Sequence, residues 1–226
     1  MTSPALASPA ERSLVVIDGL DGSGKSRFAR ALAAACEAEG EAPIFLFRVD
    51  DFRRPLGILA PGVDEAAAYY ERYYDYALLD QCLGRFLAGA TGASIPRFDP
   101  TRELVEGEQR LDFGAARLAL VEGVFPMRAA TAAAGPVVLL EVTEDEARRR
   151  ILARDTERGR PRDIVEHRMQ RRYFPAQRAY RAAFDPVRRA DVVIDNEHWE
   201  RPRLVRRLPD RLPRVVEKAL SRVVPP

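Results

Sequence analysis

Residues 19–26 read G-L-D-G-S-G-K-S and match the phosphate-binding loop pattern G-x-x-x-x-G-K-[ST] at every fixed position. The glycines permit backbone angles and close approaches that a Cβ atom would block. Successive N–H groups can then point at phosphate oxygens, and the positive end of the following helix adds to the attraction. The pattern predicts that Lys25 reaches the β- and γ-phosphates of a nucleotide and that the Ser26 hydroxyl binds Mg²⁺.

The flanking residues predict a strand before this loop and a helix after it. Residues 14–17 form a short apolar run, L-V-V-I, typical of a buried strand. After the loop, Phe28, Leu32 and Cys36 recur every four residues, and Gly40 ends the predicted helix. Strand, glycine-rich loop and helix is the context that a phosphate-binding loop requires. The chain also uses arginine almost everywhere for positive charge, yet it has a lysine at position 25.

The composition favours one globular domain and argues against nucleic acid or a membrane as a partner. We expect a loose tail over residues 1–12 and a single domain over residues 13–226. Thirty-six basic residues against 34 acidic ones leave a net charge of only +2, whereas nucleic-acid binding needs a clear positive excess. No apolar run reaches membrane-spanning length and no signal-peptide pattern is present, so we expect a cytoplasmic protein. Cys36 and Cys82 lack metal-ligand spacing and fit buried thiols.

Four further apolar runs, at residues 44–49, 118–123, 137–142 and 191–195, complete a predicted five-stranded parallel sheet with helices on both faces. Two of these strands end in acids, at the edge where open α/β sheets bind ligands. Either Asp50 or Asp51 would take a proton from an acceptor hydroxyl, unless the pair only caps a helix. Glu122 would hold Mg²⁺ directly or through a water, unless it is a surface acid at a strand end.

The region between the second and third strands is rich in turns and tyrosines. Residues 53–63 carry prolines and glycines typical of a loop, and Asp64 can cap a helix over about residues 65–87. Five of the seven tyrosines lie within residues 69–76, where they either cover the core or stack against a substrate ring. Residues 94–102 form a polar, turn-rich segment with one embedded aromatic residue.

Arginines concentrate between the last two predicted strands. Arg154, Arg158 and Arg160 begin a segment, about residues 154–172, that has two main interpretations. It is an Arg-rich lid whose guanidinium groups close over a triphosphate, or it is a solvated amphipathic helix pair. Nucleic-acid binding is a weaker third interpretation, because acids balance the arginines. Beyond residue 201, leucines at helical spacing predict one or two short helices packed on the sheet.

These stretches together resemble the uridine kinase family of P-loop kinases over about residues 14–196. Besides the glycine-rich loop, the matching segments are D-D-F-R from Asp50, I-P-R-F-D from Ile95, V-E-G-V-F from Val121, R-D-T-E-R-G-R from Arg154 and A-D-V-V-I from Ala190. The resemblance implies a P-loop kinase fold that uses ATP and Mg²⁺. It implies Asp50 as the catalytic base, with Asp51 one position away as the competitor.

The resemblance also assigns the remaining parts of the candidate site. It implies Glu122 as the Mg²⁺-associated acid beside Ser26, and Arg154, Arg158 and Arg160 as lid arginines that act in catalysis with Lys25. The candidate ATP-binding residues are Gly19, Asp21, Gly22, Ser23, Gly24, Lys25, Ser26 and Arg27. The candidate acceptor-binding region spans about residues 51–102, with Asp51, Asp75, Phe98 and Arg102 as candidate substrate contacts.

Two departures from the family pattern leave the identity of the acceptor open. Where the family has Y-D followed by a histidine that reads the pyrimidine, this chain has F-D-P-T at residues 98–101. The family segment N-F-D-H-P, which supplies a ribose-contacting acid, is replaced by the tyrosine-rich run, and Asp75 is the nearest acid. Phe98 can stack on a ring but cannot form the hydrogen bond that a tyrosine forms.

The sequence therefore predicts an ATP-dependent kinase that moves the γ-phosphoryl group to a hydroxyl, with a nucleoside as the family default. Pantothenate, nicotinamide riboside or another hydroxylated metabolite are alternative acceptors. A nucleotide-hydrolysing switch or an inactive nucleotide-binding scaffold is less well supported, because no N-K-x-D motif occurs and Lys25, Ser26, Asp50 and Glu122 are all present. The expected partners are a nucleoside triphosphate and a small-molecule acceptor, without nucleic acid or membrane; a homo-oligomer is compatible with the sequence.

Overall fold

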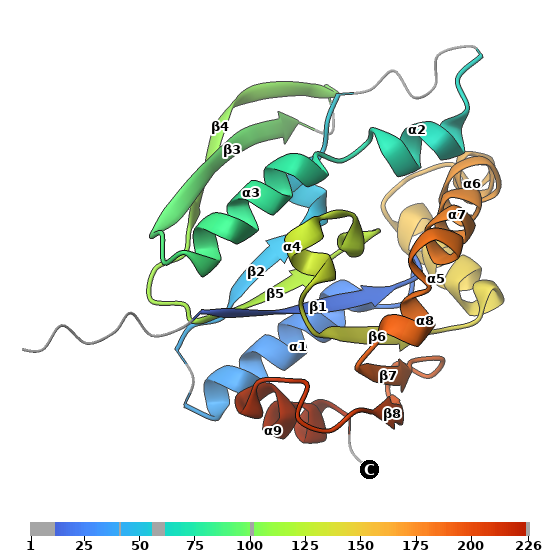
Figure 1. Cartoon of the computed structure of the whole chain (residues 1–226). Coiled ribbons are helices and arrows are strands. Elements are labelled where there is room, and N and C mark those ends of the chain that lie inside the picture. Colours follow the sequence, from blue (N-terminus) through green and yellow to red (C-terminus); the bar gives the residue numbers. More distant parts are fainter. Residues whose placement is uncertain (1–11, 41, 56–61, 100–101, 225–226) are drawn as a thin grey trace, which may run out of the picture.

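A parallel sheet built from the predicted apolar runs lies at the centre of the molecule (Figure 1). The computed structural model describes residues 12–40, 42–55, 62–99 and 102–224. The strands follow the order β2-β5-β1-β6-β7-β8. Their bounds are β1 Ser13–Gly19, β2 Phe45–Arg48, β5 Leu118–Glu122, β6 Val137–Glu141, β7 Val192–Asp195 and β8 Arg203–Arg207. The five expected strands pair in parallel, which confirms the α/β prediction, and β8 adds a sixth, antiparallel strand.

Helices cover both faces of this sheet, as expected. On one face, α1 (Lys25–Ala38) and α9 (Arg214–Val223) bury their apolar sides against β1, β5, β6 and β7. The other face carries α3 (Tyr76–Leu87), α4 (Ala130–Ala133), α7 (Phe174–Phe184) and α8 (Pro186–Arg189). Figure 1 shows these two groups on opposite sides of the strands. Cys36 and Cys82, one on each face, are buried thiols as predicted.

The expected single helix over residues 65–87 is wrong in one respect, because it breaks in the middle. The chain forms α2 (Glu65–Glu71), capped by Asp64 as predicted, and then α3. In the break, Tyr74 pairs with Arg53 in an isolated antiparallel bridge, and the Asp75 N–H donates to the Phe52 carbonyl at 2.8 Å. Backbone groups at 73–75 thus bond to the turn η1 (Val49–Phe52) and its neighbours instead of continuing a helix. Of the predicted loop over 53–63, residues 56–61 lie outside the described residues.

Two other segments form strands where the sequence predicted none. Residues 94–99 belong to β3 (Gly92–Asp99), which pairs antiparallel with β4 (Leu104–Asp112) in a separate hairpin, while residues 100–101 lie outside the described residues. The chain beyond Arg201 forms β8 rather than a helix, and only its last part is helical, in α9. Without β8, the far edge of β7 would expose unpaired backbone groups. Tertiary pairing therefore overrides the helical spacing of the leucines.

The segment predicted as a lid is a run of helices beside the carboxyl ends of the strands (Figure 1). It consists of the end of α5 (Glu144–Glu157), then α6 (Arg162–Arg168) and a π-helical turn (Met169–Tyr173) that leads into α7. At the other end of the chain, residues 1–11 lie outside the described residues. Arg12, the last residue of the predicted tail, donates to the Phe86 and Ala90 carbonyls at 3.1 and 2.6 Å. In the described ranges, we find no helix both long and apolar enough to cross a membrane.

Candidate active site

The glycine-rich loop joins β1 to α1 and is held closely by its neighbours. Gly19 and Gly22 have φ values of +149° and +82°. A Cβ atom at these positions would lie only 2.5 Å from the Leu140 carbonyl and 2.7 Å from the Ala147 carbonyl, so both positions require glycine. No side chain caps α1, and its first turn contains no acid. The free N–H groups at this helix end therefore remain available for an anion, as the loop pattern predicts.

The Ser23 hydroxyl gives a second indication that this loop binds an anion. Its Oγ is buried and has no hydrogen-bond partner among the described residues. A buried hydroxyl without a partner is uncommon, because losing its hydrogen bonds to water is costly. A phosphate bound by the loop would bring acceptor oxygens into this region. The residues present therefore fit a nucleotide phosphate chain.

Lys25, Ser26 and Glu122 come together at the start of α1. The Lys25 ammonium is buried and donates to the Gly19 and Leu20 carbonyls, at 2.8 Å each. The Ser26 hydroxyl donates to Glu122 Oε2 at 2.8 Å, which joins the loop to the end of β5. Burial raises the pKa of the Glu122 carboxyl, while the hydrogen bond from Ser26 and the charge of Lys25 act in the opposite direction. This is the pair that the sequence proposed for metal binding.

A hydroxyl and a carboxylate fit Mg²⁺, which prefers oxygen ligands and usually keeps several waters. In the part of the chain that the structure describes, no cluster of three or more His, Cys, Asp and Glu residues could form a metal cage. A cage is not required where substrate phosphates complete the coordination. Ser26 and Glu122 would hold the ion, and the phosphate oxygens would supply further ligands.

Asp50 and Asp51 lie in the turn η1, directly after β2, and their carboxylates have different partners. Asp50 Oδ1 accepts a hydrogen bond from the Tyr74 hydroxyl at 2.9 Å. Asp51 forms a two-point ion pair with Arg48, with distances of 2.8 and 3.0 Å. Burial raises the pKa of Asp51, and Arg48 opposes that shift. The two acids lie in a 3-10 turn, and within it they serve different contacts.

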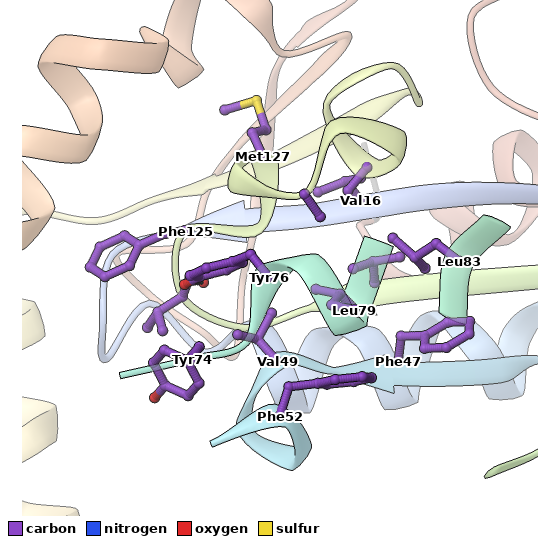
Figure 2. Packing of buried hydrophobic residues seen from close by; sticks show 14 of the residues in the cluster. Val16, Phe47, Val49, Phe52, Tyr74, Tyr76, Leu79, Leu83, Phe125 and Met127 are labelled. Atoms are coloured by element: carbon purple, nitrogen blue, oxygen red, sulfur yellow. Dashed lines mark hydrogen bonds between the residues drawn. The ribbon is translucent and has the colours of Figure 1, made fainter. Parts of the chain in front are cut away.

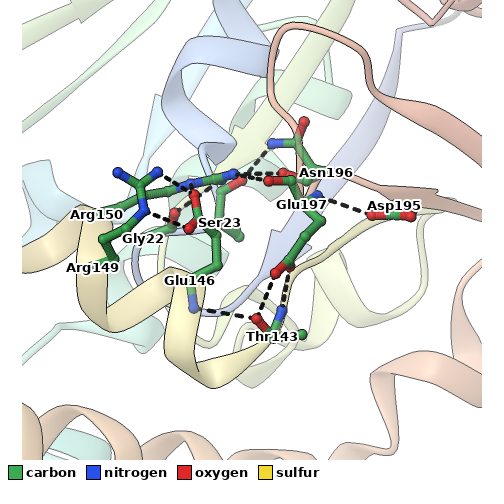
Figure 3. A network of polar contacts seen from close by, with 9 residues as sticks. All are labelled: Gly22, Ser23, Thr143, Glu146, Arg149, Arg150, Asp195, Asn196 and Glu197. Atoms are coloured by element: carbon green, nitrogen blue, oxygen red, sulfur yellow. Dashed lines mark hydrogen bonds and ion pairs between the residues drawn. The ribbon is translucent and has the colours of Figure 1, made fainter.

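A network that the sequence did not reveal holds the outer side of the loop (Figure 3). Arg150 donates to the Asn196 and Glu197 carbonyls at 2.8 and 2.9 Å, and to the Gly22 carbonyl at 3.5 Å. The Asn196 amide donates to the Ser23 carbonyl at 2.6 Å. Glu146 accepts from Arg149 and Arg150 at 2.6 Å. The only sequence signal was the run of three arginines at residues 148–150, which is compatible with either a surface or a structural role.

The lid arginines do not all behave alike. Arg154 and Arg160 both bind Asp155, at 2.7 and 2.6 Å, and the Asp155 side chain is completely buried. Burial alone would raise the pKa of Asp155, but the two guanidinium groups hold it below its usual value. The Arg158 side chain is exposed and forms no hydrogen bond or ion pair among the described residues; its backbone N–H donates to the Arg154 carbonyl at 3.3 Å. Asp155, which carried no predicted role, thus joins two of the three arginines of the predicted lid.

Two residues predicted to bind ATP, Asp21 in the loop and Arg27 in α1, point in different directions. Asp21 accepts from the Tyr69 hydroxyl at 3.4 Å and from the Gln177 amide at 3.3 Å, and burial raises its pKa. It therefore faces the tyrosines and α7. Arg27 instead lies on the exposed side of α1, with its guanidinium carbon 3.5 Å from the centre of the Trp199 ring. Arg27 therefore lies beside the chain that follows β7, whereas Asp21 lies inside the candidate site.

The predicted acceptor residues are only partly brought together. Asp75 caps α3 through the Leu78 N–H and pairs with Arg54 at 2.6 Å. Phe98, on the hairpin, lies against Arg53, whose guanidinium carbon is 4.7 Å from the centres of both the Phe98 and Tyr73 rings. Asp75 and Phe98 therefore surround the turn that carries Asp50.

Arg102 is separate from this group. Its guanidinium pairs with Glu106, four residues along the same hairpin, and its N–H donates to Asp99 at 3.3 Å. A different feature adjoins the candidate site: a cavity of about 330 Å³ reaches Ser26, Glu122 and Asp51 and is bounded by β4. The hairpin thus adjoins the candidate site through Phe98 and β4 rather than through Arg102.

Comparisons with known proteins find likenesses among solved structures. No family model matches the sequence, and no curated protein matches it. The structure of a "Possible Uridine Kinase from Bacillus stearothermophilus" has a TM-score of 0.64 at 24% identity, covering 83% of this chain and 91% of that one. A "putative fructose transport system kinase from Silicibacter sp. TM1040" has a TM-score of 0.61 at 25% identity, covering 79% of this chain and 88% of that one. The chain therefore shares the α/β fold of these kinase-like structures, with a mostly parallel central sheet and helices on both faces.

Proposed function

We propose that the protein is an ATP-dependent kinase that transfers the γ-phosphoryl group of ATP to a hydroxyl of a small molecule, with a nucleoside as the leading acceptor. One observation carries the proposal. The loop residue Ser26 bonds to Glu122 at the end of β5, and Asp50 follows the end of the adjacent strand β2. In the pairing of β2 with β5, Arg48 lies opposite Glu122, the candidate metal ligand. Asp50, the candidate base, follows Arg48 by two residues.

The side chains divide the work of phosphoryl transfer. The loop N–H groups and Lys25 bind the phosphates, and Mg²⁺ held by Ser26 and Glu122 supplies charge neutralisation at the phosphate oxygens. Asp50 accepts the proton of the acceptor hydroxyl while the hydroxyl oxygen bonds to the γ-phosphorus and the bond to ADP breaks. Arg154, Arg158 and Arg160 stabilise the charge that moves during the step.

The aromatic contacts on the acceptor side favour an acceptor with a planar ring. Phe98 and Tyr73 both lie against the guanidinium of Arg53, which is itself planar. A nucleobase has faces that stack on such rings in the same way. The base-reading histidine of the family is missing from this chain. The alternative acceptors are therefore pantothenate, nicotinamide riboside and other hydroxylated metabolites.

A panel assay tests the proposal. Purified protein with Mg²⁺ and ATP is incubated with single nucleosides, pantothenate, nicotinamide riboside and simple sugars, and both ADP release and the mass of the acceptor are measured. We expect one acceptor class to gain a phosphoryl group in proportion to the ADP released. ADP release that is equal with and without every acceptor would instead indicate a nucleotide hydrolase and contradict the proposal.

A further inference from the structure

We propose that Tyr74 is a positioning residue that holds the carboxylate of Asp50 in the orientation needed to accept a proton. The inference rests on the proposed kinase function and adds a residue to its acceptor side. From the sequence alone, the tyrosines at 69–76 were either core residues or a surface for a substrate ring. The structure gives Tyr74 a third role, because its ring packs in the core while its hydroxyl contacts the candidate base.

The ring of Tyr74 is fixed on several sides. Its side chain is 5% exposed, and its ring lies 5.0, 5.9 and 6.1 Å from those of Tyr73, Tyr69 and Tyr76. Figure 2 shows it near Val49 and Phe52, which belong to the same turn as Asp50. Tightly packed rings of this kind have little rotational freedom. The hydroxyl therefore has one accessible direction.

The backbone fixes the same contact from a second direction. Tyr74 forms the bridge with Arg53, the Arg54 N–H donates to the Tyr73 carbonyl at 3.0 Å, and the Asp75 N–H donates to Phe52. These bonds tie the break between α2 and α3 to the turn that carries the base. A displacement of either segment would move both partners together. Backbone pairing between the two segments therefore supports the hydrogen bond from Tyr74 to Asp50, which does not depend on the two side chains alone.

The hydroxyl is unnecessary for packing. A phenylalanine would fill nearly the same space, and burying a hydroxyl is unfavourable unless it finds a partner. The hydroxyl of neighbouring Tyr76 donates to the Val124 carbonyl, which is an ordinary core contact. That of Tyr74 donates instead to Asp50 Oδ1. The other oxygen of this carboxylate has no hydrogen bond from the residues that the structure describes, so it is left for the acceptor. Burial and the nearby carboxylate of Asp50 raise the pKa of Tyr74 well above its usual value, which keeps it a donor.

Replacing Tyr74 by phenylalanine tests this role, with Tyr70→Phe as the matched control. Tyr70 belongs to the same cluster, but its hydroxyl has no hydrogen bond among the described residues, and its ring contacts Phe125 and Arg128. We expect Tyr74→Phe to lower kcat about tenfold, a fraction of what a positioned base contributes, with KM for ATP unchanged. Tyr70→Phe should keep the wild-type kcat. Equal kcat values for Tyr74→Phe and wild type would overturn the proposal.

A double-variant cycle separates positioning from a general structural effect. Without the carboxylate, in Asp50→Ala, the change of Tyr74 to phenylalanine should cause no further loss of kcat. A full additional tenfold loss in that background would show that Tyr74 acts through the fold, and would overturn the proposal.

The melting temperatures of the same four proteins give a readout that does not depend on activity. Tyr74→Phe should lower the melting temperature of the wild type but not that of Asp50→Ala, where its hydroxyl has already lost its partner. Additive shifts would refute the coupling even if the acceptor were never found. A wild type without any transfer activity would refute the proposed function, and the melting cycle would still decide whether these two side chains are coupled.

Discussion

The phosphate-binding side and the acceptor side of the candidate site are constructed in different ways. The phosphate side comes from one continuous stretch, residues 19–26, supported by Glu122 and by the Arg150 network. The acceptor side gathers side chains from the turn η1, the break between α2 and α3, and the hairpin β3–β4. A local motif fixes the first, whereas distant segments must fold together to make the second. The candidate phosphate-binding side can therefore be predicted from a local motif, whereas the acceptor side depends on contacts that form only in the folded protein.

The largest effect is expected on the phosphate side. Lys25→Ala should reduce kcat more than about a hundredfold, because removing a charge aimed at the transferring phosphates costs on the order of 3 kcal/mol or more of barrier. The other lysine gives a matched control, since Lys218 lies exposed on α9. We expect Lys218→Ala to have wild-type turnover in the same assay. A folded Lys25→Ala protein with near-normal transfer would contradict the assignment of this side.

Variants of the predicted lid arginines test whether charged side chains outside the loop stabilise the transition state. Arg158→Ala and Arg160→Ala should each lower kcat about 10- to 100-fold and change the Kd for Mg-ATP much less. Arg162→Ala is the control, because Arg162 lies in the next helix and, within the described ranges, pairs with Glu166 alone, on the same exposed surface. If both variants keep the wild-type kcat, these arginines belong to a solvated surface.

A smaller effect is expected from the network behind the loop. Hydrogen bonds from Arg149 and Arg150 hold the pKa of Glu146 at about 2, against an ordinary value of 4.5. A lowered pKa stabilises the fold above pH 4.5, and that contribution is lost as the pH falls toward 2. Glu146→Gln should therefore lower the free energy of unfolding by about 1 kcal/mol near neutral pH. In chemical denaturation, its difference from wild type should shrink between pH 4.5 and 2.

The control for this comparison is Asp145→Asn. Asp145 is exposed and forms no ion pair in the described part of the chain. Its substitution should leave the free energy of unfolding nearly unchanged at every pH. A pH-independent difference between Glu146→Gln and wild type would show that packing, and not the charge of Glu146, accounts for the effect.

The sequence predicted the middle of the sheet well because four of its strands are continuous buried runs. β1, β5, β6 and β7 lie between helices on both faces, so nearly every residue is apolar and the pattern is unambiguous. It also predicted that Ser26 and Glu122 would lie close together, since the carboxyl ends of adjacent parallel strands meet at one edge.

The missed elements are those whose residues are mostly exposed. In β3 and β4 only Ile95 and Leu111 are buried, so the alternation that marks a strand is weak. The break at residues 72–75 depends on backbone partners some twenty positions earlier, which no local pattern reveals. The same reason explains why Tyr74 escaped notice, because its partner Asp50 lies 24 positions earlier. The partners of Asp155 are close to it in the sequence, but only the fold reveals that its carboxylate is completely buried between them.

The comparison of Asp50→Asn with Asp51→Asn tests the central claim most directly, with Mg-ATP binding and kcat measured for each on the acceptor that the panel identifies. Asparagine keeps the size of aspartate and removes its charge and its capacity to accept the proton. We predict that Asp50→Asn binds Mg-ATP like the wild type and loses about 10²- to 10⁴-fold in kcat. Asp51→Asn, which gives up the ion pair with Arg48, should lose far less in kcat. An inactive Asp51→Asn beside an active Asp50→Asn, or two active variants, would contradict the assignment of Asp50 as the base.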